Sequence, residues 1–300
     1  MAQFKRIKRP VSGVLLLDKP LGFSSNQALQ KVKWLYQAAK AGHTGTLDPL
    51  ATGLLPICFG EATKFSHYLL DAHKGYHATI QLGSTTTTGD AEGEVLSRSE
   101  VSVSPAQLDR VIAHFIGKIT QVPPMYSALK FEGKALYEYA REGVDIERAA
   151  RDVTIFDVQL IRFEKDVIEI TVTCSKGTYI RTLAEDMGAA LGCGAHLIGL
   201  RRTSTADYRL ENAVTIEQLE KMTLNDKDAL LLAVDSSLQN MPAVHVDADS
   251  AFYLSQGQSI WQSGQIPAED FRLYDAAGTF LGLGKRLDDG KIAPKRLVNL

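Results

Sequence analysis

The stretch from Ala41 to Leu54 reads Ala-Gly-His-Thr-Gly-Thr-Leu-Asp-Pro-Leu-Ala-Thr-Gly-Leu. Its three glycines and one proline predict an irregular loop and not a regular helix or strand. Because Pro49 disfavours the helical conformation for the residue before it, we expect an extended backbone at Asp48. A single carboxylate on a constrained loop is typical of a catalytic residue. An Asp-Pro pair is equally typical of a simple turn, and the loop alone leaves both interpretations open.

Length and composition place the chain among globular proteins of one large domain or two unequal ones. It has 300 residues, of which 45% are hydrophobic, enough for a sizeable buried core. Its apolar runs are too short to span a membrane, and no signal peptide is recognisable, so we expect a cytoplasmic protein. The three cysteines are far apart in the sequence, which argues against a disulfide framework and against a cysteine-based zinc site.

The charges are distributed unevenly, although the net charge is only −2. Residues 1–76 contain ten Lys or Arg against four Asp or Glu, whereas residues 207–249 contain three against nine. The segment from residue 284 onward is basic again. Basic segments at both ends could form one phosphate-facing surface, with the acidic part turned away from it. Ordinary scatter of surface charge is the alternative.

The hydrophobic pattern alternates between strands and helices. We expect strands at 13–17, 54–59, 74–82, 153–163, 167–174 and 195–205, and helices at 24–36, 61–70, 105–115, 134–141, 178–191 and 216–222. Ser24 or Ser25, Ser104 and Thr178 are expected to cap three of these helices. Short segments separated by glycines after residue 249 predict a small β-barrel of about fifty residues.

Four blocks of sequence, in this order and spacing, carry a family resemblance. They are Gly-Val-Leu-Leu-Leu-Asp-Lys-Pro (13–20), Gly-His-Thr-Gly-Thr-Leu-Asp-Pro-Leu-Ala-Thr-Gly (42–53), Pro-Pro-Met-Tyr-Ser-Ala-Leu-Lys (123–130) and Lys-Gly-Thr-Tyr-Ile-Arg-Thr-Leu (176–183). Together they resemble the TruB family of tRNA pseudouridine synthases. The resemblance is close over residues 10 to about 210, and the later residues are similar to the small PUA-type domain of that family.

This resemblance implies the α+β pseudouridine synthase fold, in which helices flank a central mixed, mostly antiparallel β-sheet. It implies a catalytic domain over residues 1–248, with an insertion at 124–152 that contacts RNA, and a PUA-like β-barrel domain over residues 249–300. The implied reaction isomerises uridine-55 in the TΨC loop of tRNA, without cofactor or metal. Base flipping is followed by cleavage of the N-glycosidic bond, rotation of the base and formation of a C5–C1′ bond.

The resemblance also assigns roles to individual residues. Asp48 matches the catalytic carboxylate; whether it attacks the ribose or the base, or abstracts a ribose proton, stays open. Arg181 matches the arginine that pairs with this aspartate, and Tyr76 the tyrosine that stacks on the target base and is a candidate to remove the C5 proton. Tyr179 and Leu200 match residues that line the uracil pocket.

The remaining implied contacts are with RNA. His43 matches the histidine that inserts beside the flipped nucleotide, and Lys19, Lys64 and Asp90 are expected to contact that nucleotide or neighbouring phosphates. Within the insertion, four side chains suit RNA contact: Tyr126, Lys130, Lys134 and Arg141.

The implied partner is the T-arm of tRNA, bound by a monomer that needs no protein partner. An RNA-binding chaperone that folds tRNA on the same scaffold is the alternative function. An RNA-guided relative is disfavoured by the insertion and by the absence of long basic extensions.

Overall fold

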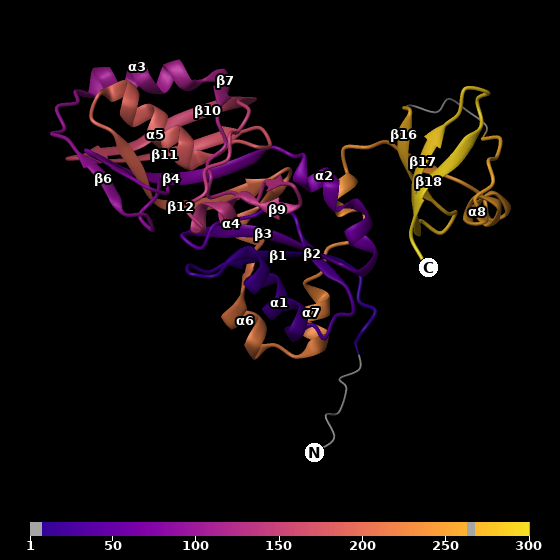
Figure 1. Cartoon of the computed structure of the whole chain (residues 1–300). Helices are drawn as coiled ribbons and strands as arrows, with labels where there is room; N and C mark the ends of the chain where they lie inside the picture. Colours follow the sequence, from indigo (N-terminus) through magenta and orange to yellow (C-terminus); the bar gives the residue numbers. More distant parts are fainter. Residues whose placement is uncertain (1–7, 263–267, 300) are drawn as a thin grey trace.

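A computed structural model describes residues 8–262 and 268–299. Figure 1 shows a larger part built on one long sheet and a smaller part that contains β16, β17 and β18. The strands of the larger sheet are β1 (Gly13–Lys19), β2 (Ala41–His43), β3 (Ala51–Phe59), β4 (Lys74–Leu82), β7 (Gly117–Gln121), β10 (Arg151–Glu164), β11 (Val167–Cys174), β12 (Ala195–Thr205), β13 (Tyr208–Arg209) and β14 (Val214–Thr215). No helix within the described ranges is long and apolar enough to cross a membrane.

The larger sheet is mixed and mostly antiparallel, as predicted. Its strand order is β14-β1-β3-β12-β4-β11-β10-β7, with β2 paired to β3 and β13 paired to β12. Only the β1–β14 and β12–β3 pairs are parallel. The β12–β3 pair brings the strand that leaves the 41–54 loop beside the strand that carries Leu200. Two elements far apart in the sequence therefore meet at the centre of the sheet.

Helices cover the two ends of this sheet and create two hydrophobic cores. α3 (Pro105–Phe115) and α5 (Ile180–Leu191) pack on β4, β10, β11 and β12. α1 (Ser25–Leu35) and α6 (Ile216–Lys221) pack on β1, β3 and β14. Figure 1 shows these helix pairs at opposite ends of the larger part. The other helices there are α2 (Ser66–Leu70), α4 (Leu136–Arg141) and α7 (Leu224–Ala229), with short 3-10 helices η1 (Gly60–Phe65), η2 (Leu210–Asn212) and η3 (Ser236–Leu238).

Two of the three expected helix caps are present. Ser24 and Ser104 each accept a hydrogen bond from the backbone of the third helical residue, which completes a capping box. The expected cap at Thr178 is wrong, because α5 begins after Tyr179. The Thr178 hydroxyl donates instead to the carbonyl of Ser175. The backbone of Tyr179 is held by the side chain of Gln121, from the end of β7.

Three expected segments differ from the structure. The 41–54 stretch is irregular only in its middle: its first residues form β2, and β3 begins at Ala51. Gly53 has a positive φ, and a Cβ there would lie 2.4 Å from the carbonyl oxygen of Arg202, so glycine permits the close β12–β3 pairing.

The helix expected at 61–70 is split into η1 and α2, and the one expected at 134–141 begins only at Leu136. β8 (Lys130–Phe131) and β9 (Lys134–Ala135) form a small hairpin ahead of it. A second hairpin joins β5 (Ser84–Thr86) to β6 (Val95–Arg98).

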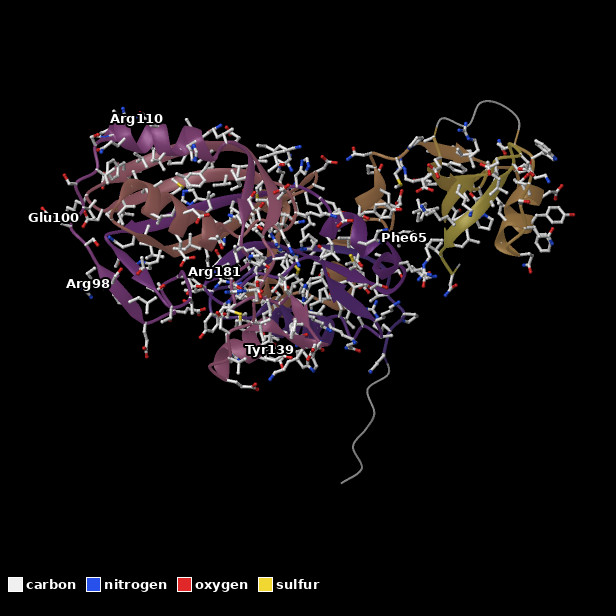
Figure 2. All side chains as sticks on the ribbon, turned by 45° about the horizontal axis from the view of Figure 1, so that its top comes forward. Phe65, Arg98, Glu100, Arg110, Tyr139 and Arg181 are labelled. Carbon is white, nitrogen blue, oxygen red and sulfur yellow. The ribbon has the colours of Figure 1, made fainter. Side chains whose placement is uncertain are left out.

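The C-terminal part is an open sheet over the described residues, and the expected closed barrel is wrong. β15 (Ala243–His245), β16 (Asp270–Tyr274), β17 (Phe280–Arg286) and β18 (Ile292–Leu297) pair in that order, so β15 and β18 lie at opposite edges. α8 (Ala248–Ser255) packs beside them, and the sheet includes residues that precede the expected boundary after residue 248. Phe65 packs against Leu283 where the two parts meet, and Figure 2 shows Phe65 on that side of the larger part.

Candidate active site

The loop that carries Asp48 is fixed by hydrogen bonds to α1. The Ser25 hydroxyl accepts from the backbone N–H of Leu47 at 2.7 Å and donates to its carbonyl at 3.0 Å. The carbonyl of Asp48 accepts from the N–H of Ala51, so the residue does open a turn. Its carboxylate takes no part in that turn and instead faces Arg181. The turn at Asp48 therefore leaves its carboxylate free for another role, so the two interpretations are compatible.

Arg181, at the start of α5, contacts three other segments of the chain. Its Nε lies 3.1 Å from Oδ2 of Asp48, and its Nη1 lies 3.5 Å from Oδ2 of Asp90. Nη1 also donates to the carbonyl of Thr88 at 2.9 Å, and Nη2 donates to the carbonyl of Tyr126 at 2.6 Å. The arginine side chain is 6% exposed and the Asp48 side chain 39%. The guanidinium is thus locked in place, while the carboxylate stays accessible.

Burial is the main influence on the pKa of Asp48 and raises it above the ordinary value for aspartate. The Arg181 charge acts in the opposite direction, Asp90 raises the pKa further, and Lys19 lowers it. An aspartate with a raised pKa is a stronger base than an exposed one. The ion pair with Arg181 keeps this basic carboxylate in one orientation.

Two adjoining cavities open on either side of Asp48. The larger has a volume of about 610 Å³ and the smaller about 300 Å³. Six residues line both of them: Thr46, Leu47, Asp48, Ser127, Ala128 and Arg181. Figure 2 shows Arg181 in the middle of the larger part, surrounded by other side chains. A group held in either cavity could therefore reach the same carboxylate.

The smaller cavity gathers the residues expected around a flipped base. Tyr76 of β4, Tyr179 at the start of α5 and Leu200 of β12 all line it. Burial raises the pKa of the Tyr76 hydroxyl, and the nearby charge of Arg202 acts in the opposite direction. Burial also raises the pKa of Tyr179. Both phenols are part of the wall of this cavity.

The larger cavity gathers His43, Asp90 and part of the insertion. Burial lowers the pKa of His43, and its Nδ1 is buried without a hydrogen-bond partner among the described residues. Asp90 is nearly inaccessible, because Oδ1 accepts from the Thr88 hydroxyl and from the N–H of Glu92 while Oδ2 faces Arg181. From the insertion, the lining residues include Tyr126, Tyr137 and Arg141.

The four lysines expected to contact RNA line neither cavity. Lys19 is fully buried behind the loop, where its Nζ donates to the carbonyls of Pro20 and Phe23, and burial lowers its pKa to about 8. Lys64 donates to the carbonyl of Leu297 in β18 and pairs with Glu61, at the contact with the C-terminal part. Lys130 and Lys134 belong to the β8–β9 hairpin.

The comparisons with known proteins all indicate one family. The sequence matches the TruB family pseudouridylate synthase N-terminal domain over residues 33–180. It also matches the tRNA pseudouridylate synthase B C-terminal domain over 181–239 and the C-terminal domain of pseudouridine synthase II TruB over 242–298. A protein of Methylobacillus flagellatus named tRNA pseudouridine synthase B is 63% identical over 296 residues, which cover 99% of this chain and 98% of the relative. The chain belongs to the TruB family of pseudouridylate synthases. A relative of the same name from Ectopseudomonas mendocina is 54% identical over 302 residues, 99% of both chains.

Solved structures show that this TruB-family chain has a widely shared fold. A chain from the crystal structure of a Cbf5-Nop10-Gar1 complex superposes with a TM-score of 0.69, at 24% identity, and the match covers 92% of this chain and 78% of the other. A chain from a structure of an H/ACA RNP bound to a substrate RNA containing 2′-deoxyuridine gives a TM-score of 0.71 at 21% identity, with 96% and 85% covered. The α+β pseudouridine synthase fold expected from the sequence is confirmed.

Sequence reasoning missed three residues of this TruB-family site. Ser127 lines both cavities, Gln121 holds the backbone of Tyr179, and Arg202 lines the smaller cavity. For Arg202 a signal was present, because residues 200 and 202 of one strand point to the same face. For Gln121 none was present, since its contact joins residues 58 positions apart.

Proposed function

We propose that this TruB-family chain isomerises uridine-55 in the TΨC loop of tRNA to pseudouridine, with Asp48 as the catalytic carboxylate. The observation that carries the proposal is the position of Asp48. It lies on the wall common to two cavities, ion-paired to a buried arginine yet accessible to a ligand. Relatives of 54% and 63% identity are named tRNA pseudouridine synthase B, which supports tRNA as the substrate.

In the proposed reaction the target uridine leaves its stack and its base enters the smaller cavity. Tyr76 stacks on the base, and Tyr179 and Leu200 supply further apolar contact that compensates for the lost stacking, about 1–3 kcal/mol per base. The ribose and its phosphates then lie toward the larger cavity, beside His43 and the insertion. Asp48 faces the glycosidic bond, which is the place where either a nucleophile or a base is needed.

The isomerisation breaks the N1–C1′ bond, whose electron pair leaves with the uracil ring. The base rotates, and C5 forms the new bond to C1′. Three roles for Asp48 agree with its position: attack on C1′, attack on C6, or removal of a ribose proton. All three require an ionised and oriented carboxylate, which is what the ion pair with Arg181 provides.

Asp90 and the lysines take modified roles in this proposal. Because Asp90 is nearly inaccessible and faces Arg181, it acts on the nucleotide through that arginine and not by direct contact. Lys19 supports the turn after β1 and places a positive charge behind Asp48. Lys64 reaches RNA only where the C-terminal part meets the larger part. We assign the catalytic role to the larger part of the chain and an accessory RNA-binding role to the C-terminal sheet.

A release assay tests the proposed reaction. Unmodified tRNA carrying tritium at C5 of uridine should release label when it is incubated with the chain, and Asp48→Asn should abolish the release. Asp157→Asn, at an exposed position of β10 where the carboxylate bonds only Gln159, is the matched control and should retain full activity. Undiminished release by Asp48→Asn would refute the assignment of Asp48. If the chain instead acted only as a tRNA-folding chaperone, neither variant nor the unmutated chain would release label.

We also propose that the chain works in the cytoplasm as a monomer on the T-arm alone, without a protein partner. An isolated T-arm hairpin should then be modified by the purified chain at a rate comparable with that of full tRNA. A requirement for a guide RNA or for added protein would contradict this part of the proposal.

A further inference from the structure

Arg202 is the largest side chain that is fully buried among the described residues, with 1% exposed. It lies on β12, opposite Gly53 of β3 and opposite Tyr76 of β4. It therefore stands between the strand that leaves the Asp48 loop and the strand that carries the tyrosine of the site. Its side chain forms part of the wall of the smaller cavity.

The Arg202 guanidinium bonds only neutral groups. Its Nε donates to the carbonyl of Leu54 at 2.6 Å, and Nη2 donates to the carbonyl of Gly45 at 3.4 Å. Tyr76 is its direct cross-strand neighbour, and both side chains line the smaller cavity. The next residue on the strand, Arg201, pairs with Asp18, whereas Arg202 forms no ion pair within residues 8–262 and 268–299.

A buried cation without a counter-ion is an unfavourable choice for a purely structural position. Two backbone carbonyls could be satisfied by a neutral amide donor of similar length, without the desolvation penalty of a charge. The positive charge therefore indicates a partner that is anionic during part of the catalytic cycle. Among the groups that Arg202 touches, only the Tyr76 hydroxyl can become an anion.

We propose that Arg202 is a positioning residue for the isomerisation, which holds Tyr76 as the acceptor of the C5 proton. This inference rests on the proposed function. A guanidinium has five donors and no acceptor, so in a hydrogen bond between the two residues the Tyr76 oxygen is the acceptor. The remaining lone pair or hydrogen of that oxygen is then directed into the cavity, toward the base. The Arg202 charge lowers the pKa of Tyr76 against the larger, opposing effect of burial, and so favours the phenolate, the form that accepts a proton.

The step balances as a proton exchange with water. After C5 has bonded to C1′, the C5–H bond breaks and its proton passes to the Tyr76 phenolate. The electron pair of that bond forms C5=C6, and the N1=C6 pair moves onto N1, which takes a proton from water. The Tyr76 phenol later returns its proton to water, and no other reactant is consumed.

An isotope effect separates this role from simple support of the loop. Single-turnover conversion of tRNA transcripts with hydrogen or deuterium at C5 of uridine would be followed by nucleoside chromatography. Arg202→Met should slow conversion on the order of 10²-fold, within the range that a positioned general base contributes. It should also raise the C5 deuterium isotope effect above that of the unmutated chain. A displaced Asp48 loop would slow the earlier glycosidic step and would not raise this isotope effect.

Three variants complete the test. Arg201→Met, on the neighbouring ion-paired arginine, should leave the isotope effect unchanged. Arg202→Lys keeps the charge and should show a smaller loss of rate with the isotope effect still raised; it carries the test if Arg202→Met does not fold. In a Tyr76→Phe background, Arg202→Met should cause little further loss, because both changes disable the same proton transfer.

Each outcome has a distinct meaning. A slower Arg202 variant with an unchanged isotope effect, an unchanged rate, or full additivity with Tyr76→Phe would each overturn the inference. Absence of conversion by the unmutated chain would instead contradict the proposed function itself.

Discussion

Replacement of Gln121 by methionine tests how α5 is oriented. The side chain is 3% exposed; its Oε1 accepts from the N–H of Tyr179 at 3.1 Å, and its Nε2 donates to the Tyr179 carbonyl at 3.3 Å. That carbonyl also accepts from Leu183, so Gln121→Met leaves one buried N–H without a partner. An unsatisfied donor costs about 1–3 kcal/mol, and the second bond contributes about 0.5–1.5 kcal/mol. The free energy of unfolding should therefore fall by about 1.5–4.5 kcal/mol.

The effect on activity should exceed the effect on stability. Arg181 is the second residue of α5, so a small rotation of the helix start moves its Nε away from Asp48. A displacement of about 1 Å can cost roughly 10²-fold in rate. Chemical denaturation gives the first quantity, and single-turnover release of C5 tritium gives the second. The denaturation midpoint and the single-turnover rate should both fall at a temperature where the variant is folded.

Gln121→Glu sharpens the same prediction. An ionised carboxylate can still accept from the N–H of Tyr179 but repels its carbonyl, whereas a protonated carboxyl can donate to that carbonyl. The defect of Gln121→Glu should therefore shrink as the pH falls, and that of Gln121→Met should not. An unchanged rate and unchanged stability in Gln121→Met would refute the role of this contact.

Three further predictions use the same assays. Asp90→Asn removes the buried carboxylate that lies 3.5 Å from Nη1 of Arg181 and should lower the rate about tenfold, which equals about 1.4 kcal/mol, while tRNA binding is kept. Burial lowers the pKa of Lys19 and Lys74 from 10.5 to about 8, so between pH 8 and pH 10.5 the unfolded chain binds more protons than the folded chain. The free energy of unfolding should therefore rise with pH in this range, and it should rise less in Lys74→Met. Denaturation at several pH values measures both. The affinity for tRNA should fall steeply with salt, and a flat titration would contradict phosphate-dominated binding.

The sequence predicted those elements whose pattern is local. The bounds of β4, β11 and α3 agree with expectation because each has a period of two or 3.6 residues. The Asp48 loop was recognised from its glycines and proline, although its ends join strands through pairing that only the folded sheet supplies. The prediction of a closed C-terminal barrel was wrong for a similar reason. Evenly spaced turns indicate short strands, but they do not show whether the first and last strands pair.

For the site residues, too, some positions could be predicted from the sequence and others could not. The resemblance placed Asp48 and Arg181 together, and their atoms lie 3.1 Å apart. It could not place Lys64, whose partner is a carbonyl 233 positions away, nor reveal that Asp90 is sealed off behind Arg181. Such contacts depend on packing between remote segments, which periodicity does not report.

The bond from Nη2 of Arg181 to the carbonyl of Tyr126 has a consequence for inhibition. It makes the insertion and Asp48 share one guanidinium, and the larger cavity opens directly onto both. A small molecule that presents an acceptor to Nη2 would compete with Tyr126 and draw Arg181 away from Asp48. Such a compound would disable the enzyme without resembling uracil and without entering the cavity that receives the base.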